Sequence, residues 1–222
     1  MLGEFLGSGA SITKLLLHLN GNSNDSSGNG NNGTDTSITY SLANGKFGQG
    51  AGFNGSSSRI NLPTSLVQTG NFTISLWVKF VDATNNILFS AVDFAVNYGW
   101  VVFETNGSDK FVMTVFSNGA ATSQSVVSNE TLVEGRWYNL IGVRDGTNIK
   151  LYINGSYDNQ SAWSTAQNST VQSTNLGYGK NGGGGINYMD GQIDEVIVEN
   201  VAWSAEKVKK YFTNSKGRFG II

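Results

Sequence analysis

The carboxylates near the end of the chain are the first groups whose type and spacing could do chemistry. Glu195 and Glu199 occur in the run "DEVIVE". Glycoside hydrolysis requires two carboxyl groups, about 5–5.5 Å apart for retention or about 6.5–9.5 Å apart for inversion. Residues four apart in a strand share a face but are separated by about 13 Å, and Asp194 would point to the opposite face. The run therefore favours a partly solvent-facing strand, and a glycoside hydrolase is kept only as an alternative.

The single histidine and the absence of cysteine limit the other chemistries. His18 lies in "LLLHLNG" with no nucleophile-elbow sequence nearby, which favours a packed or surface histidine over a Ser-His-Asp triad. One histidine without cysteine also argues against a zinc site. The glycine-rich "GKNGGGG" over 179–185 lacks the Lys-Ser/Thr ending of a phosphate loop, so we interpret it as a long turn. We therefore predict that the protein is not an enzyme.

What remains is a surface for recognition, and aromatic and planar polar side chains are the groups that hold sugars. Most aromatic residues belong to a core. Trp163 is the leading candidate because it lies in the polar run "DNQSAWSTAQNS" with nothing apolar around it in sequence. The predicted carbohydrate-binding residues are Tyr98, Trp100, Trp163, Tyr178, Asn181, Asn187, Tyr188 and Asp190.

Short strands are the elements that would position these residues. Charged residues make up 14% of the chain, and 29 glycines stand against one proline, which favours strands joined by Gly/Asn turns. "FTISLWVKF" alternates with period two, and Asn154-Gly155 is a hairpin signal. "SAEKVKKYF" predicts one short helix with Ser204 as its N-cap. About a dozen strands without βαβ alternation predict an all-β fold, a two-sheet antiparallel sandwich.

Charge and hydropathy exclude two kinds of partner. The net charge is −2 and the isoelectric point about 5.4, so we expect no nucleic-acid partner. No apolar run is long enough to span a bilayer, so we expect no membrane partner. The first residues lack the basic segment of a signal peptide, which predicts synthesis in the cytoplasm.

Five blocks in this order resemble the laminin-G-like, concanavalin A-like jelly roll of lectins and glucanases. They are "DSSGNGNNG", "GKFGQGAGFNGSSSRINLP", "NFTISLWVKF", "GRWYNLIGVRDGTNIKLYINGS" and "LGYGKNGGGGINYMDGQIDEVIVENVAWSAEKV". The resemblance covers roughly Lys14 to Phe212 and implies one jelly-roll domain over 14–212, with one concave and one convex sheet. Residues 1–13 and 213–222 are then expected to be N-terminal and C-terminal arms.

The resemblance also implies a structural calcium ion. In domains of this type the N-terminal strand, the loop before "FNG" and the final "G-x-I-D-E" strand meet at one edge, where calcium takes oxygen ligands. The residues in these places are Asp25, Asn54 and Asp194. The alternative is that Asp25 caps a turn through its own backbone and Asp194 accepts hydrogen bonds from N–H groups at the edge.

The function predicted from the sequence is a non-catalytic, lectin-like module that binds a glycan or cell-surface polysaccharide. Such a module would suit a phage virion as a decoration or fibre-type accessory protein, displayed outside the cell after lysis. The alternative is a purely structural virion protein that contacts a capsid neighbour through arms that contain Phe5, Leu6, Phe219, Ile221 and Ile222.

Overall fold

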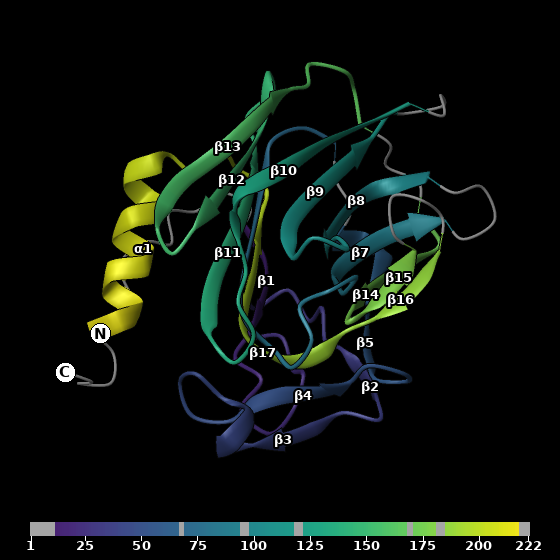
Figure 1. The fold of residues 1–222 in the computed structure, drawn as a ribbon. Coiled ribbons are helices and arrows are strands. Elements are labelled where there is room, and N and C mark those ends of the chain that lie inside the picture. The colour runs from purple at the N-terminus through teal and green to yellow at the C-terminus, as the bar shows by residue number, and fades with distance from the viewer. Residues whose placement is uncertain are drawn as a thin grey trace.

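The protein, described here by a computed structural model, is a sandwich of two antiparallel sheets (Figure 1). The structure describes residues 12–66, 69–93, 98–117, 122–167, 171–180 and 185–217. The first sheet has the strand order β13-β12-β11-β6-β17-β4-β3, and β1 also pairs with β17. The second sheet has the order β10-β9-β8-β7-β14-β5-β2. The predicted fold class is therefore confirmed.

The strands of the first sheet are β1 (Thr13–Leu17), β3 (Thr39–Ser41), β4 (Gly50–Asn54), β6 (Phe72–Phe80), β11 (Trp137–Arg144), β12 (Asn148–Ile153), β13 (Ser156–Ala162) and β17 (Asp190–Glu199). Those of the second are β2 (Thr34–Thr36), β5 (Arg59–Leu62), β7 (Ile87–Asp93), β8 (Tyr98–Thr105), β9 (Lys110–Phe116), β10 (Ser123–Thr131) and β14 (Ser173–Leu176). A small hairpin joins β15 (Tyr178–Lys180) to β16 (Ile186–Tyr188), and the helical elements are η1 (Leu42–Asn44), η2 (Thr64–Leu66) and α1 (Ala205–Gly217).

Alternation of side chains along β6 explains how the sheets stack. Phe72, Ile74 and Leu76 belong to the apolar core between the sheets. Thr73 and Trp77 lie on the outer face, where Thr73 Oγ1 donates to the carbonyl of Val201, 2.8 Å away. Because successive side chains of a strand point to opposite faces, this one strand serves both the core and the layer outside it.

The predicted turn at Asn154-Gly155 is also confirmed. Asn154 has φ of 52° and Gly155 has φ of 79°, so both turn residues adopt the left-handed conformation that a type I′ hairpin requires. A Cβ atom on Gly155 would lie 2.7 Å from Cβ of Phe212 in helix α1. The glycine therefore allows both the turn and the close approach of the helix.

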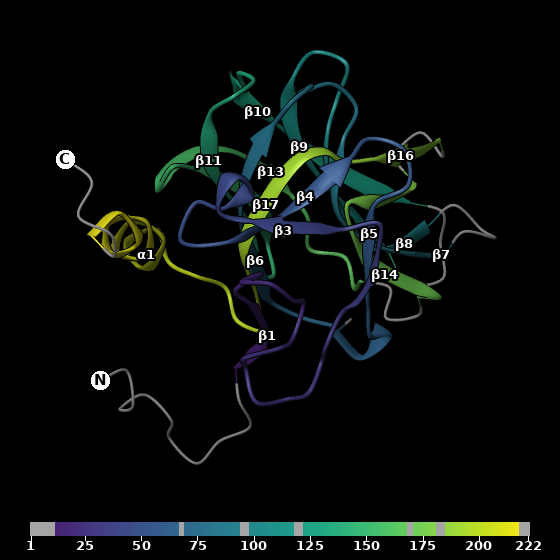
Figure 2. The ribbon, with the colours of Figure 1, turned by 90° about the horizontal axis from the view of Figure 1, so that it is seen from below.

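Helix α1 packs on the outer face of the first sheet. Ser204 Oγ accepts a hydrogen bond from the backbone N–H of Lys207 at 3.1 Å, which confirms the predicted N-cap. The ring of Phe212 stacks on Trp77 with centroids 5.6 Å apart. Figures 1 and 2 both show the helix on one side of the sandwich and the β15–β16 hairpin on the other.

Described elements extend into the ranges predicted as arms. Helix α1 continues to Gly217, so the expected arm over 213–222 is wrong for residues 213–217. Within this last part of the helix, Thr213 and Ser215 donate through their hydroxyls to backbone carbonyls four residues earlier, which satisfies these short polar side chains. At the other end, β1 begins at Thr13, opposite Glu199. Residues 1–11 and 218–222, which contain the five predicted docking residues, lie outside the described ranges.

The β15–β16 hairpin lies against the outer face of the second sheet. Ser90 Oγ of β7 donates to the carbonyl of Tyr178 at 2.7 Å. A Cβ atom on Gly179 would lie 2.3 Å from that same Oγ, so only glycine allows this approach. Within the described ranges, no helix combines the length and the apolar character needed to cross a membrane.

Candidate functional site

A polar hollow opens where the β15–β16 hairpin meets the end of the first sheet. Its volume is about 270 Å³. We call it the rim pocket, and its lining residues are Gly55, Asp82, Thr84, Asn85, Asn86, Ile186, Asn187, Tyr188 and Asp190. They come from the end of β4, the loop between β6 and β7, strand β16 and the first residue of β17.

Asn86 ties these segments together. Its side chain is 1% exposed. Its Oδ1 accepts from the backbone N–H of Asp190 at 2.7 Å, and its Nδ2 donates to the carbonyls of Asp82 and Thr84 at 2.7 and 3.1 Å. Its own backbone N–H donates to Thr105 Oγ1 at 2.9 Å. One buried amide therefore fixes the β6–β7 loop against β17, which is distant in sequence.

Asp82 at the mouth of the pocket is held in its ionised form. The hydroxyl and the backbone N–H of Thr84 donate to Asp82 Oδ1 at 2.6 and 2.8 Å. These hydrogen bonds hold the pKa of Asp82 below its ordinary value. Asn85 follows with φ of 53°, a left-handed conformation that asparagine tolerates better than most residues. The turn thus presents a carboxylate and an amide side by side.

Three of the side chains that line the pocket have spare hydrogen-bonding capacity. Asn54 Oδ1 accepts from three backbone N–H groups of its own turn. By contrast, within the described part of the chain the side-chain oxygens and nitrogens of Asn85, Asn187 and Asp190 make no hydrogen bond. Because unpaired polar groups are stable only where solvent or a ligand can reach them, these three are available for recognition.

An aromatic stack supports one wall of the pocket. The ring of Tyr188 packs on that of Tyr178 with centroids 5.0 Å apart and planes tilted by 39°. The guanidinium of Arg59 lies 5.5 Å from the centre of the Tyr178 ring. Beside them Ile186 is 54% exposed, which is unusual for so large an apolar residue. The wall therefore offers both a fixed ring and apolar surface.

The structure brings together three of the predicted sugar-binding residues. Asn187, Tyr188 and Asp190 line the rim pocket, and Tyr178 lies directly behind it. The sequence reasoning did not single out the β6–β7 loop, whose run "DATNN" has the composition of an ordinary turn. Asn181 and the side chain of Tyr98 lie outside the described ranges.

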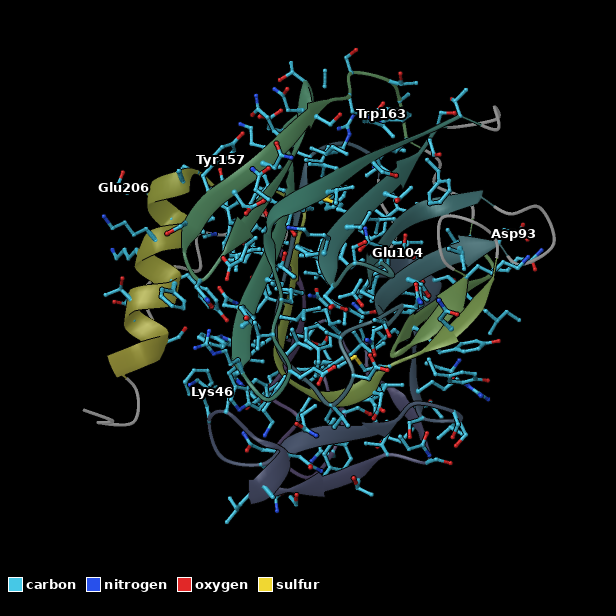
Figure 3. The ribbon with its side chains drawn as sticks, viewed as in Figure 1. Lys46, Asp93, Glu104, Tyr157, Trp163 and Glu206 are labelled. Carbon is cyan, nitrogen blue, oxygen red and sulfur yellow. The ribbon has the colours of Figure 1, made fainter. Side chains whose placement is uncertain are left out.

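The structure contradicts the predicted roles of two tryptophans. Trp100 is 1% exposed, and its ring packs on those of Phe72 and Phe89 between the sheets. Trp163 follows β13 at the top of the view in Figure 3 and is only 7% exposed. Its backbone N–H donates to the carbonyl of Thr147 at 2.8 Å, and its side chain joins the core. Polar neighbours in sequence do not keep a ring in solvent when the chain turns it inward.

The predicted calcium ligands do not form one site. Asn54 pairs with Asp190, four residues before Asp194 on β17, so Asn54 and Asp194 are separated by about 13 Å along the strand. Asp25 lies beyond β1, opposite Leu17. Among the residues that the structure describes, no three histidine or acidic side chains converge in a way that could hold a metal ion. These three residues therefore do not fit a shared calcium ion.

The alternative roles of the two aspartates are confirmed. Asp25 Oδ1 accepts from the backbone N–H groups of Leu16 and Ser27 at 3.0 and 2.9 Å. Asp194 Oδ2 accepts from those of Lys46 and Phe47 at 2.8 and 2.9 Å. Both carboxylates thus organise backbone turns. Binding of a structural calcium ion by the chain stays a prediction, which melting curves with calcium and with a chelator test.

Replacing Asp194 by asparagine is expected to change how stability depends on pH. Asp194 is 0% exposed, and this burial raises its pKa to about 6 from 3.8. Between about pH 4 and 6 the folded state binds a proton that the unfolded state releases, so the aspartate costs stability as pH rises through this window. Relative to the wild type, Asp194→Asn should gain about 2–3 kcal/mol between pH 4 and 7.5, measured by urea unfolding.

Asp25→Asn is the matched control, because its stability relative to the wild type should change with pH in the opposite direction. Although burial opposes it, hydrogen bonds from Ser27, Leu16 and Asn31 lower the pKa of Asp25. This variant should therefore lose stability relative to the wild type as pH rises. Equal pH dependence of Asp194→Asn and wild type would show that the buried carboxyl titrates normally.

A β-bulge in β17 changes which acidic residues share a face. Asp194 pairs with Trp77 but Ile197 pairs with Ser75, so two residues of β17 stand opposite one of β6. Glu195, inside the bulge, has φ of 49°. The side chains after the bulge therefore change faces relative to a regular strand.

The expectation that Asp194 points away from Glu199 is wrong for this reason. The two pair with Trp77 and Thr73, which are four apart on β6 and share its outer face. The carboxylates also have separate partners. Glu195 Oε1 contacts His18 Nδ1 at 2.9 Å, while Glu199 Oε2 accepts from Trp203 Nε1 and Lys207 Nζ at 2.6 and 2.7 Å.

The fold defines a jelly-roll class of domain, and the sequence comparison gives its family. Residues 54–209 match the Laminin_G_3 family, described as the concanavalin A-like lectin/glucanases superfamily. The chain belongs to this superfamily, as the resemblance predicted. A comparison with curated proteins gives no match.

Solved structures share the fold. Domain 4 of AbnA, a GH43 extracellular arabinanase from Geobacillus stearothermophilus solved with arabinotriose, superposes with a TM-score of 0.71 at 22% identity over 89% of this chain and 97% of that one. The binding domain of Paraclostridial Mosquitocidal Protein 1 gives 0.68 at 13% identity, over 86% of this chain and 49% of that one. The receptor binding domain of botulinum neurotoxin C/D mosaic serotype gives 0.66 at 14%, over 91% and 51%. The chain spans about half the length of these two toxin domains.

Proposed function

We propose that the chain is a non-catalytic module that binds a carbohydrate in the rim pocket. The observation that carries this proposal is the group of unpaired polar side chains, Asn85, Asn187 and Asp190, beside the exposed edge of a fixed aromatic stack. Amide groups donate and accept hydrogen bonds, and carboxylates accept them, which suits the hydroxyls of a sugar ring. A hollow in which a small number of polar groups converge is typical of a site for a small ligand.

The apolar wall supports the same proposal. A sugar presents C–H groups on one face of its ring and hydroxyls around its edge. Ile186 and Tyr188 supply apolar surface for the C–H face, and Tyr178 holds the Tyr188 ring in place from behind. The ligand is therefore expected to be gripped from two sides.

The related folds make a carbohydrate the first ligand class to test. The arabinanase domain was solved with arabinotriose, and another neighbour, a botulinum neurotoxin binding domain, was solved with SialylT. Neither shares more than 22% of its residues with this chain, so these ligands suggest a class and not a particular sugar. Display on a virion stays a prediction from the sequence.

Binding without hydrolysis is the part of the proposal that concerns Asp82. A glycosidase needs one carboxyl group with a raised pKa to protonate the leaving oxygen. Asp82 has a lowered pKa and is exposed at the mouth of the pocket, so it cannot serve as that acid near neutral pH. We expect binding without release of reducing sugar from any retained glycan.

The experiment is a glycan array followed by calorimetry with the glycan that binds most tightly. Asn187→Ala removes one amide from the pocket and is expected to weaken binding about tenfold, which is roughly the contribution of one good hydrogen bond. Asn148→Ala is the control, because Asn148 lies at the other end of the first sheet and its amide donates only to Thr147 Oγ1. Equal affinity of wild type and Asn187→Ala would remove the rim pocket as the site.

A further inference from the structure

Among the residues that the structure describes, the charged side chains that line the rim pocket have one sign. They are the carboxylates of Asp82 and Asp190, and the lining includes no lysine, arginine or histidine. Lys180 pairs with Ile186 across the hairpin but is not part of the lining. Asp82 stays ionised at neutral pH and below because Thr84 donates to it twice. A ligand in this hollow therefore meets negative charge that no cation of the lining compensates.

The guanidinium of Arg59, beside the aromatic wall, is already engaged away from the pocket. Arg59 lies over the face of Tyr178, which stands behind Tyr188, and its Nε donates to Asn61 Oδ1 at 3.2 Å. A planar guanidinium that faces a carboxylate in two-point contact is the usual way to hold an acidic sugar. Here the guanidinium instead packs on the Tyr178 ring of the aromatic wall.

We infer that the rim pocket selects uncharged or amino-bearing sugars and rejects sugars that carry carboxylate, sulfate or phosphate. This inference rests on the proposed function and names the ligand class for the same site. Repulsion between the pocket carboxylates and an anionic sugar is sufficient for this selectivity, so the preferred sugars need no additional attractive contact. A protonated amino group would gain from the same two carboxylates.

The expected discrimination is about tenfold. Two like charges about 4 Å apart repel weakly in water and several times more strongly near a protein surface. Since Asp82 is exposed, we use the weaker repulsion energy, that between charges in water, for each carboxylate. The discrimination should shrink when salt rises from about 0.05 M to about 0.5 M, because screening shortens the reach of exposed charges. A difference caused by sugar shape would not respond to salt in this way.

The test uses an array that contains neutral, N-acetylated, amino-bearing, sialylated, sulfated and uronate-bearing oligosaccharides. It includes two matched pairs that differ mainly in charge: chitooligosaccharides and their deacetylated forms, and oligogalacturonates and their methyl esters. The retained glycans should be neutral or amino-bearing. The oligogalacturonate should bind about tenfold more weakly than its methyl ester, and the deacetylated chitooligosaccharide should bind at least as tightly as the acetylated one.

Two isosteric variants check the cause. Asp82→Asn and Asp190→Asn should each reduce the discrimination against anionic sugars severalfold and reduce any preference for amino sugars. Asp158→Asn is the charge-matched control, because Asp158 lies on β13 at the far edge of the first sheet and accepts from the backbone of Asn129 and Glu130. It should leave the discrimination unchanged.

The outcomes separate this inference from the proposed function. No retained glycan, or binding that Asn187→Ala leaves unchanged, would contradict the proposed function. Anionic glycans that bind as well as neutral ones, with affinity still lost in Asn187→Ala, would overturn the inference and leave the proposed function standing.

Discussion

Replacing Trp100 by alanine should lower the free energy of unfolding by about 3–5 kcal/mol. The side chain is 1% exposed and packs on the rings of Phe72 and Phe89, with centroids 4.7 and 6.4 Å away. Alanine would remove the largest side chain of this layer and leave a cavity between two sheets that cannot easily close. Urea unfolding at neutral pH measures the change.

Two further results distinguish a core role of Trp100 from a role in ligand binding. Trp100→Phe should cost much less, because the indole Nε1 has no hydrogen-bond partner to lose in the folded protein and a ring still fills the layer. Below its melting temperature, Trp100→Ala should bind glycan with unchanged affinity. Lost affinity without lost stability would instead support Trp100 as a ligand contact, as the sequence suggested.

Asn86→Ala is expected to damage both stability and recognition. The change leaves the backbone N–H of Asp190 without its acceptor and removes two donations to the carbonyls of Asp82 and Thr84. Loss of a buried amide that joins the β6–β7 loop to β17 should cost about 2–4 kcal/mol. Because the loop would then be held less firmly against β17, glycan affinity should fall at least as far as in Asn187→Ala.

Hydrogen exchange distinguishes this positioning role from a general loss of stability. The amide of Asp190 should exchange much faster in Asn86→Ala, while amides in the centre of β6 keep their relative protection. Asn148→Ala, which removes an amide from the opposite end of the sheet, should change neither exchange at Asp190 nor affinity. Unaltered exchange at Asp190 would mean that Asn86 does not hold the two segments together.

Regular alternation is the part of the fold that the sequence predicts well. The pattern of β6 and the left-handed turn at Asn154-Gly155 are local properties, so a short window of residues contains the information. The bulge at Glu195 is different. A glutamate with positive φ has no compositional signal, and the bulge is defined only by pairing with β6. For this reason the face of Asp194 relative to Glu199 could not be predicted from spacing.

The candidate site also contains residues that the sequence predicted and residues that it did not. Asn187 and Asp190 were predicted because they flank the glycine-rich turn, and Tyr188 because it is an aromatic residue of a loop. The structure places all three in one pocket. The opposite wall comes from the β6–β7 loop, about a hundred residues earlier, and it is joined to β17 through the Asn86 amide and through a hydrogen bond from the Val81 N–H to the Asp190 carbonyl. Trp163 shows the reverse error, because burial is decided by the direction of the chain after β13 and not by the polarity of its sequence neighbours.

The most direct test of the account is an amide chemical-shift map of the isotope-labelled protein titrated with the tightest neutral oligosaccharide. We predict that the largest shifts fall in residues 82–86 and 186–190, which line the rim pocket, with small changes in helix α1 and in β13. Shifts that concentrate on α1 or β13, with residues 82–86 and 186–190 unmoved at saturation, would contradict the claim that this pocket is where the protein binds carbohydrate.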